Sequence, residues 1–137
     1  MIGKKIRLCV NSNIEDPKFI EILSEECKIQ TVHHLISENL SPEDPEIMIR
    51  ANEKDFHIIT ANIKDFKRYF RTITTIKIGV IGIPAEYFKC LPVLRHLLQR
   101  EIKVHSNLYN KFYEMDSTGQ YRCWDKSWKA IIQKTSL

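Results

Sequence analysis

Oxygen-bearing side chains gather at three places in this sequence of 137 residues. They carry carboxylate, amide or hydroxyl groups: Asn11, Ser12, Asn13, Asp44, Thr60, Asn62 and Asp65. Oxygen ligands of this kind suit Mg²⁺ or Mn²⁺, ions that proteins hold through a few groups while several waters stay bound. A metal held in this way activates water and screens phosphate charge, so the natural substrate class is a phosphodiester.

The elements that must position these side chains alternate along the first hundred residues. Short apolar runs predict strands at 6–10, 28–35, 56–60 and 76–84. Apolar residues at helical spacing predict helices at 16–27, 41–54, 65–70 and 86–100. This alternation predicts an α/β fold, with an open, mostly parallel sheet and helices on both faces. Ligands bind outside the carboxyl ends of the strands in such a sheet, so the three places can converge on one cleft.

The segment after Glu101 departs from this alternation. We therefore expect an α/β domain over 1–100 and a C-terminal extension over 101–137, packed on the same domain. Within the extension we expect a strand at 102–105, a short helix at 108–115, a turn or hairpin at 117–125 and an amphipathic segment at 126–132.

Charge is distributed unevenly along the chain. Residues 1–63 hold 7 Lys or Arg against 11 Asp or Glu, whereas residues 64–137 hold 14 against 6. This asymmetry suits a chain whose first half contributes a carboxylate or metal site and whose second half holds a polyanion. Uneven placement of solubilising charge explains it equally well.

Basic and aromatic residues are interleaved just after the third oxygen-bearing group: Lys64, Phe66, Lys67, Arg68, Tyr69, Phe70 and Arg71. This mixture suits phosphate contacts and base stacking with RNA. An ordinary amphipathic helix, with rings inward and cations in water, is the alternative. A second such group contains Tyr109, Tyr113, Tyr121, Arg122, Trp124, Lys126 and Trp128. A dimer contact or capping of the core explains the second group at least as well.

Several classes of protein are not indicated. The four cysteines are scattered without a C-x-x-C pair, so we expect free thiols rather than a zinc site or disulfides. Gly-rich phosphate loops and the nucleophile motif G-x-S-x-G are missing. No apolar run approaches the roughly 20 residues of a membrane span, and the first residues turn polar too soon for a signal peptide. We therefore expect a cytoplasmic protein that does not enter a membrane.

Three short motifs follow one another in the chain: V-N-S-N at 10–13, E-D-P-E-I-M-I-R-A at 43–51 and I-I-T-A-N-I-K-D-F at 58–66. Their order and spacing resemble the PIN-like domains, and among these the small stand-alone proteins close to the VapC-type toxin ribonucleases. The pattern of that group is V-D-E-N, then S-D-x-x-I-x-x-x-A, then I-V-T-x-D-x-D-F. The resemblance spans about residues 5 to 100.

The resemblance implies a three-layer α/β/α sandwich that cuts RNA at an acidic cluster loaded with Mg²⁺ or Mn²⁺. Carried over by position, the four acids of the family fall on Asn11, Asp44, Asn62 and Asp65. Two of the four are therefore amides, which bring no formal negative charge to a metal. Thr60 would orient a water or a ligand in this arrangement.

Structural roles would explain the same residues without catalysis. Asp44 is favourably placed in the first turn of a helix, where the helix dipole favours acids. Asp65 can cap a helix that begins at Phe66. Asn11 and Asn13 suit a turn of the chain, because asparagine tolerates left-handed backbone and makes Asx-turns.

Two hypotheses about function follow. The first is a toxin-type endoribonuclease that depends on Mg²⁺ or Mn²⁺, with Asp44 and Asp65 as metal ligands and Asn11 and Asn62 completing the shell. The second is a catalytically inactive PIN-like module that binds RNA or a protein partner through its basic second half. The implied partners are RNA, an antitoxin-like protein and a second copy of the chain in a homodimer.

Overall fold

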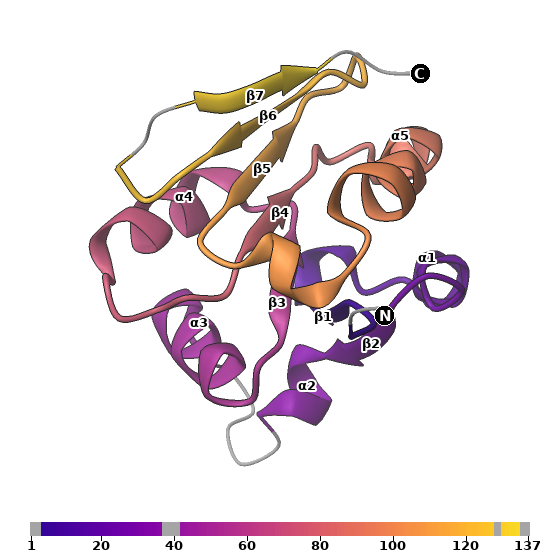
Figure 1. The fold of residues 1–137 in the computed structure, drawn as a ribbon. Helices are drawn as coiled ribbons and strands as arrows, with labels where there is room; N and C mark the ends of the chain where they lie inside the picture. Colours follow the sequence, from indigo (N-terminus) through magenta and orange to yellow (C-terminus); the bar gives the residue numbers. More distant parts are fainter. Residues whose placement is uncertain (1–3, 37–41, 128–129, 135–137) are drawn as a thin grey trace.

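A seven-stranded sheet runs through the centre of the molecule in the order β2-β1-β3-β4-β5-β6-β7 (Figure 1). The computed structural model describes residues 4–36, 42–127 and 130–134. The strands are β1 (Arg7–Val10), β2 (Lys28–Thr31), β3 (His57–Thr60), β4 (Val80–Gly82), β5 (Phe112–Met115), β6 (Tyr121–Trp124) and β7 (Ala130–Lys134). Neighbouring strands from β2 to β5 are parallel, whereas β6 is antiparallel to both β5 and β7. The predicted mostly parallel sheet is confirmed.

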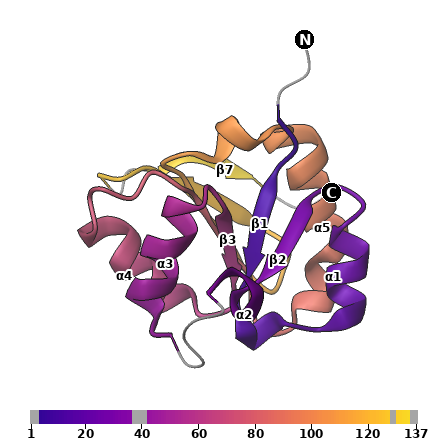
Figure 2. The ribbon, with the colours of Figure 1, turned by 90° about the horizontal axis from the view of Figure 1, so that it is seen from below.

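Helices cover both faces of the sheet. They are α1 (Pro17–Leu23), α2 (Val32–Leu35), α3 (Asp44–Glu53), α4 (Ile63–Thr72) and α5 (Leu91–His96). Shorter helical segments are the 3-10 turns Ser12–Ile14, Tyr87–Cys90 and His105–Leu108 and the π-helical turn Leu97–Ile102. Seen from below, α1 and α5 lie on one side of the sheet, and α3 and α4 on the other (Figure 2). None of the helices in the described part of the chain has the length and apolar character of a membrane span.

Alternating strand residues divide the core into two layers, because successive side chains point to opposite faces of a sheet. Towards α1 and α5 the buried residues include Leu8, Val10, Phe19, Ile59, Ile81 and Leu94. Towards α3 and α4 they include Cys9, Met48, Ile58, Phe66, Phe70, Val80 and Phe112. All four cysteines are buried as free thiols. The molecule is thus a three-layer α/β/α sandwich, as predicted.

The second strand is shorter than predicted. Residues 28–31 pair with β1, but residues 32–35, expected in the same strand, form α2. The hydroxyl of Thr31 accepts a hydrogen bond from the backbone N–H of His34 and so caps the start of this helix. A local cap therefore ends the strand, although the β-branched residues around it favour an extended chain.

Two other elements also differ from their predicted bounds. In the strand expected over 76–84, only Val80–Gly82 pairs with neighbouring strands. The backbone N–H groups of Lys77 and Ile78 donate to the side chain of Asn52 instead. The helix expected over 41–54 begins at Asp44, with Glu43 at the N-cap, and Ser41 lies outside the described residues.

The last third of the chain builds part of the central sheet. The strand predicted at 102–105 and the helix predicted at 108–115 are wrong: residues 105–108 form a 3-10 turn, and residues 112–115 form β5. Pairing with β4 on one side and β6 on the other overrides the helical pattern of this short segment. The predicted hairpin is confirmed between β5 and β6. The residues expected as an extension, 101–137, thus contribute β5, β6 and β7 to the same sheet.

A buried histidine pair ties β3 to the loop that precedes β5. Nδ1 of His57 accepts a hydrogen bond from the N–H of Gly79 at 2.8 Å, so its Nε2 carries the proton donated to the carbonyl of His105. Nδ1 of His105 accepts from the N–H of Arg7, which leaves Nε2 to donate to Asp55 at 3.0 Å. Burial lowers the pKa of His57 to about 3, so this ring is neutral in the folded protein.

Candidate functional site

The five residues predicted as a site meet at the carboxyl ends of β1 and β3. Asn11 follows β1, and Thr60 is the last residue of β3. Asp44 is the first residue of α3, while Asn62 and Asp65 lie at the N-cap and in the first turn of α4. Hydrogen bonds connect all five side chains, through the backbone of Asn62 at one point. We call this group the acidic corner.

The inner part of the acidic corner is buried and joined by hydrogen bonds. Nδ2 of Asn11 donates to Oγ1 of Thr60 at 2.8 Å, and the backbone N–H of Asn62 donates to the same oxygen at 3.0 Å. Oδ1 of Asn11 accepts from the N–H of Ser12 at 2.8 Å. Both Asn11 and Thr60 are buried. The amide of Asn11 therefore shapes the turn after β1, as its structural explanation requires, and its oxygen already has a donor.

The outer part of the acidic corner is built around one nitrogen. Nδ2 of Asn62 donates to Oδ2 of Asp44 at 2.9 Å and to Oδ2 of Asp65 at 3.1 Å. Asn62 occupies the N-cap position of α4 but makes no capping hydrogen bond, because its side chain links α3 to α4 instead. Burial, and after it the negative charge of Asp65, raise the pKa of Asp44.

This donor set does not fit a divalent cation as it stands. Two carboxylates face a common point, but the N–H groups of Asn62 occupy that point and supply positive partial charge there. The described residues contain no group of three or more His, Cys, Asp or Glu side chains arranged to hold a metal ion. A metal at this point would have to displace the amide nitrogen that donates to both carboxylates. Only two formal negative charges would attract it.

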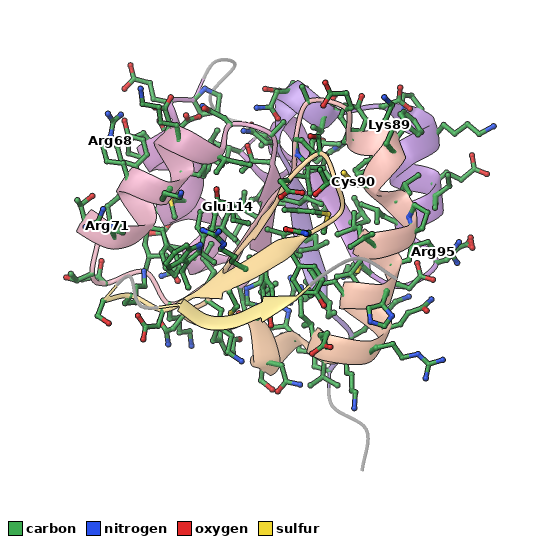
Figure 3. The ribbon with its side chains drawn as sticks, turned by 90° about the horizontal axis from the view of Figure 1, so that it is seen from above. Arg68, Arg71, Lys89, Cys90, Arg95 and Glu114 are labelled. Carbon is green, nitrogen blue, oxygen red and sulfur yellow. The ribbon has the colours of Figure 1, made fainter. Side chains whose placement is uncertain are left out.

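The four residues predicted to bind RNA line one surface hollow beside the acidic corner. Its volume is about 350 Å³, and its lining residues are Lys64, Lys67, Arg68, Arg71, Thr72, Lys126 and Ser127. Arg68 and Arg71 project from α4 on the side of the molecule opposite to Lys89 and Arg95 (Figure 3). Phe66 and Phe70 are fully buried beneath. Helix α4 is therefore amphipathic, and its cations surround a concave surface that we call the basic hollow.

Lys126 joins this hollow from the C-terminal part of the chain. Its Nζ donates to the carbonyl of Phe70 at 2.9 Å and lies 4.0 Å from the centroid of the same ring. Burial lowers the pKa of Lys126 to about 8. Its aromatic and basic neighbourhood is visible in the sequence, but its position beside α4 depends on long-range packing of the chain. Trp128 of the same predicted group lies outside the described residues.

Carboxylates of described residues lie next to Lys67 and Arg68 of the basic hollow. Nζ of Lys67 lies 2.8 Å from Oε1 of Glu114, and the guanidinium of Arg68 lies 3.6 Å from Asp65. Glu114 lies in β5 and is not among the site residues predicted from the sequence. These carboxylates occupy positions next to the cations that a phosphate group could take, so a nucleic acid would compete with them.

Comparison with known proteins does not extend these observations. No protein-family profile, curated protein or solved structure matches the chain. Its function must therefore be inferred from the residues of the acidic corner and the basic hollow. The resemblance to PIN-like domains stays an expectation based on the three motifs.

Proposed function

We propose that this protein is a PIN-like module that binds RNA through the basic hollow without requiring hydrolysis at the acidic corner. The observation that carries the proposal is the convergence of Lys64, Lys67, Arg68 and Arg71 on one concave surface, where Lys126 joins them. Arg68 also lies over the ring of Tyr69, 4.8 Å from its centroid, which gives the rim a planar group on which a base can stack. Cations beside a stacking surface are the combination that single-stranded RNA requires.

The state of the acidic corner supports binding rather than cleavage. One oxygen of each carboxylate already accepts a hydrogen bond from Asn62, and the oxygen of Asn11 accepts one from the backbone. Removal of Asp44 should therefore leave the affinity for RNA almost unchanged. The antitoxin-like partner and the homodimer stay predictions.

Fluorescence anisotropy with a labelled single-stranded RNA of ten uridines tests this proposal. Binding should weaken steeply with salt, and Lys64→Ala and Arg71→Ala should each reduce affinity several-fold. Each should also lower the slope of log K against log salt by about 0.7, the value for one phosphate contact on a single strand. Lys89→Ala is the matched control, because this exposed lysine lies on the opposite side of the molecule (Figure 3). Salt-independent binding, or equal effects of all three variants, would contradict the proposal.

A metal-dependent endoribonuclease is the second candidate, and one distance pattern favours it. An oxygen of Asp44 and an oxygen of Asp65 lie 2.9 and 3.1 Å from the same atom, so both carboxylates already point at a common centre. Isothermal titration of Mn²⁺ at near-neutral pH and low salt, on the native chain and on Asp44→Ala, separates the candidates. Binding that Asp44→Ala abolishes would justify a search for RNA cleavage. No binding to the native chain would leave the RNA-binding module.

A further inference from the structure

A second hollow lies at the turn end of the hairpin formed by β5 and β6. Its volume is about 220 Å³, and its lining residues are Glu114, Asp116, Gln120, Tyr121 and Arg122. Glu114 appears in the centre of Figure 3, between α4 and the strands of the hairpin. The ion pair between Lys67 and Glu114 connects the two hollows, because Lys67 lines the first and Glu114 lines the second. A ligand that crosses this ion pair would occupy both.

The carboxylate of Glu114 is held in place with one oxygen left to accept. The Nζ of Lys67 forms an ion pair with Oε1 at 2.8 Å, and the indole N–H of Trp124 donates a hydrogen bond to the same oxygen at 3.2 Å. Among the described residues, Oε2 takes part in no hydrogen bond. The hydrogen bond and the ion pair on one oxygen orient the group, so the second oxygen is a fixed acceptor on the wall of the hollow.

Arg122 faces Glu114 across the hairpin. The two residues are direct cross-strand partners in the antiparallel pair, so their side chains leave the same face of the sheet. Opposite charges in this position commonly attract each other, yet within the described part of the chain these two form no ion pair. The hollow therefore presents an acceptor on one wall and a guanidinium, which donates to pairs of acceptors, on the other.

The rim of the hollow is a rigid turn. Oδ1 of Asp116 accepts hydrogen bonds from the N–H and hydroxyl of Thr118 and from the N–H of Gln120. The backbone N–H of Asp116 donates to the carbonyl of Gln120 at 2.9 Å, and Gly119 provides the positive φ of 87° that the turn requires. Glu114 and Arg122 are thus held at fixed positions on either side of this turn.

We infer that this second hollow is a nucleobase subsite that selects guanine, and this inference rests on the proposed RNA binding. Guanine presents N–H donors at N1 and N2, which suit the free oxygen of Glu114, and acceptors at O6 and N7, which suit a bidentate arginine. The base would enter the second hollow while its phosphates are held by the basic hollow. A base without matching polar groups would leave the second oxygen of Glu114 and the guanidinium of Arg122 without partners in the hollow, at a cost in affinity.

The test compares the affinities of RNAs that differ at one base. A strand of ten uridines receives a single central guanine, adenine, cytosine or inosine, and anisotropy gives each dissociation constant. Guanine should bind about tenfold tighter than adenine, the effect expected of one bidentate contact. Inosine, which lacks the N2 amine, should fall between them. Arg122→Met and Glu114→Ala should each bring the guanine-to-adenine ratio close to one.

The affinity for the all-uridine strand should change in opposite directions in the two variants. Glu114→Ala frees Lys67 from its carboxylate and should tighten binding of the all-uridine strand, whereas Arg122→Met should weaken it slightly. Arg100→Met and Glu86→Ala are matched controls at exposed positions, and both should keep the full guanine preference. Circular dichroism confirms that each variant is folded.

Three results would overturn the subsite. Salt-dependent binding without preference for guanine, or with preference for cytosine, would remove this inference and leave the proposed function intact. A guanine preference that persists in Arg122→Met would place the recognition elsewhere. No RNA binding at all would overturn both proposals.

Discussion

A single amide nitrogen decides how the acidic corner behaves. Nδ2 of Asn62 donates to Asp44 and Asp65, so each carboxylate gains a partner without any bound ion. An amide in this place relieves the repulsion between the two acids, and a cation bound at the same point would have to displace it. Because Asp65 retains a side chain that is 40% exposed, the corner can still exchange with solvent.

Asn62→Asp should make the stability of the protein depend on metal. The substitution replaces the bridging N–H groups by a third negative charge, so the free energy of unfolding should fall by about 1 to 2 kcal/mol in metal-free buffer. Mn²⁺ should restore the melting temperature. Asn62→Ala is the comparison, because it removes the bridge without adding charge and should gain little from Mn²⁺. Equal responses of the two variants to Mn²⁺ would refute this view of the corner.

The buried histidines predict a loss of stability in mild acid. The pKa of His57 is about 3 in the folded protein and near 6.5 in the unfolded chain, so only the unfolded chain takes up this proton between those values. The contribution of His57 to the free energy of unfolding should therefore be constant above pH 7 and fall below pH 6.5, by about 1 kcal/mol per pH unit.

Urea titrations at pH 7.5, 6.0 and 5.0 measure this dependence. Phosphate-free buffers keep the basic hollow unligated. His33→Gln, at an exposed histidine, should leave the slope unchanged. A free energy of unfolding that stays constant down to pH 5 would show that His57 titrates normally in the folded state.

At the scale of elements, the sequence predicts the strands and helices that have a regular hydrophobic pattern. It predicts less well the element boundaries that depend on local side-chain hydrogen bonds. The order of the strands up to β4 and of α1, α3 and α4 follows from periodicity. The convergence of Asn11, Thr60 and Asp44 follows from the parallel sheet that this order implies. The bridging role of Asn62 could not be predicted, because an asparagine before a helix ordinarily caps it. The position of Glu114 could not be predicted from the sequence either. Glu114 lies beside α4 only because residues 112–115 form the strand β5, whereas the sequence predicts a helix there.

The π-helical turn after α5 ends at a strained residue. Lys103 has φ 66° and ψ −53°, and the N–H of Val104 donates to the carbonyl of Ile102 at 2.7 Å across it. Side chains with a Cβ rarely adopt this conformation, whereas glycine does so at little steric cost. Lys103→Gly should therefore raise the free energy of unfolding by about 1 kcal/mol. Lys89→Gly, in a turn without positive φ, should lower it, and thermal or urea unfolding compares the two.

At the scale of the whole molecule, the chain forms one sheet rather than a domain and an attached extension. β5 pairs with β4, and Phe112 of β5 is fully buried against Phe70 of α4 with ring centroids 5.5 Å apart. The basic hollow lies where the early helix α4 meets Lys126 and Ser127 of the late chain. The second hollow is built by the late strands alone, and the ion pair between Lys67 and Glu114 connects it to α4.

Phe112→Ala tests whether the late strands unfold together with the rest of the sheet. Removal of a fully buried phenylalanine leaves a cavity and should cost about 3 to 4 kcal/mol of unfolding free energy. Phe88→Ala is the matched control, because Phe88 is 43% exposed and should cost far less. A single unfolding transition in both variants, shifted strongly only by Phe112→Ala, is the expected result. A small effect at Phe112 would mean that the late strands unfold separately.

The strand order also has a consequence for the order of events during folding. β5 and β6 are joined by a tight turn, so their contacts are local and can form within microseconds. β1 and β3 are parallel neighbours separated by a long crossover, and closing that loop costs chain entropy before any contact compensates it. We therefore expect the hairpin with Glu114 and Arg122 to form early, and the acidic corner to assemble last.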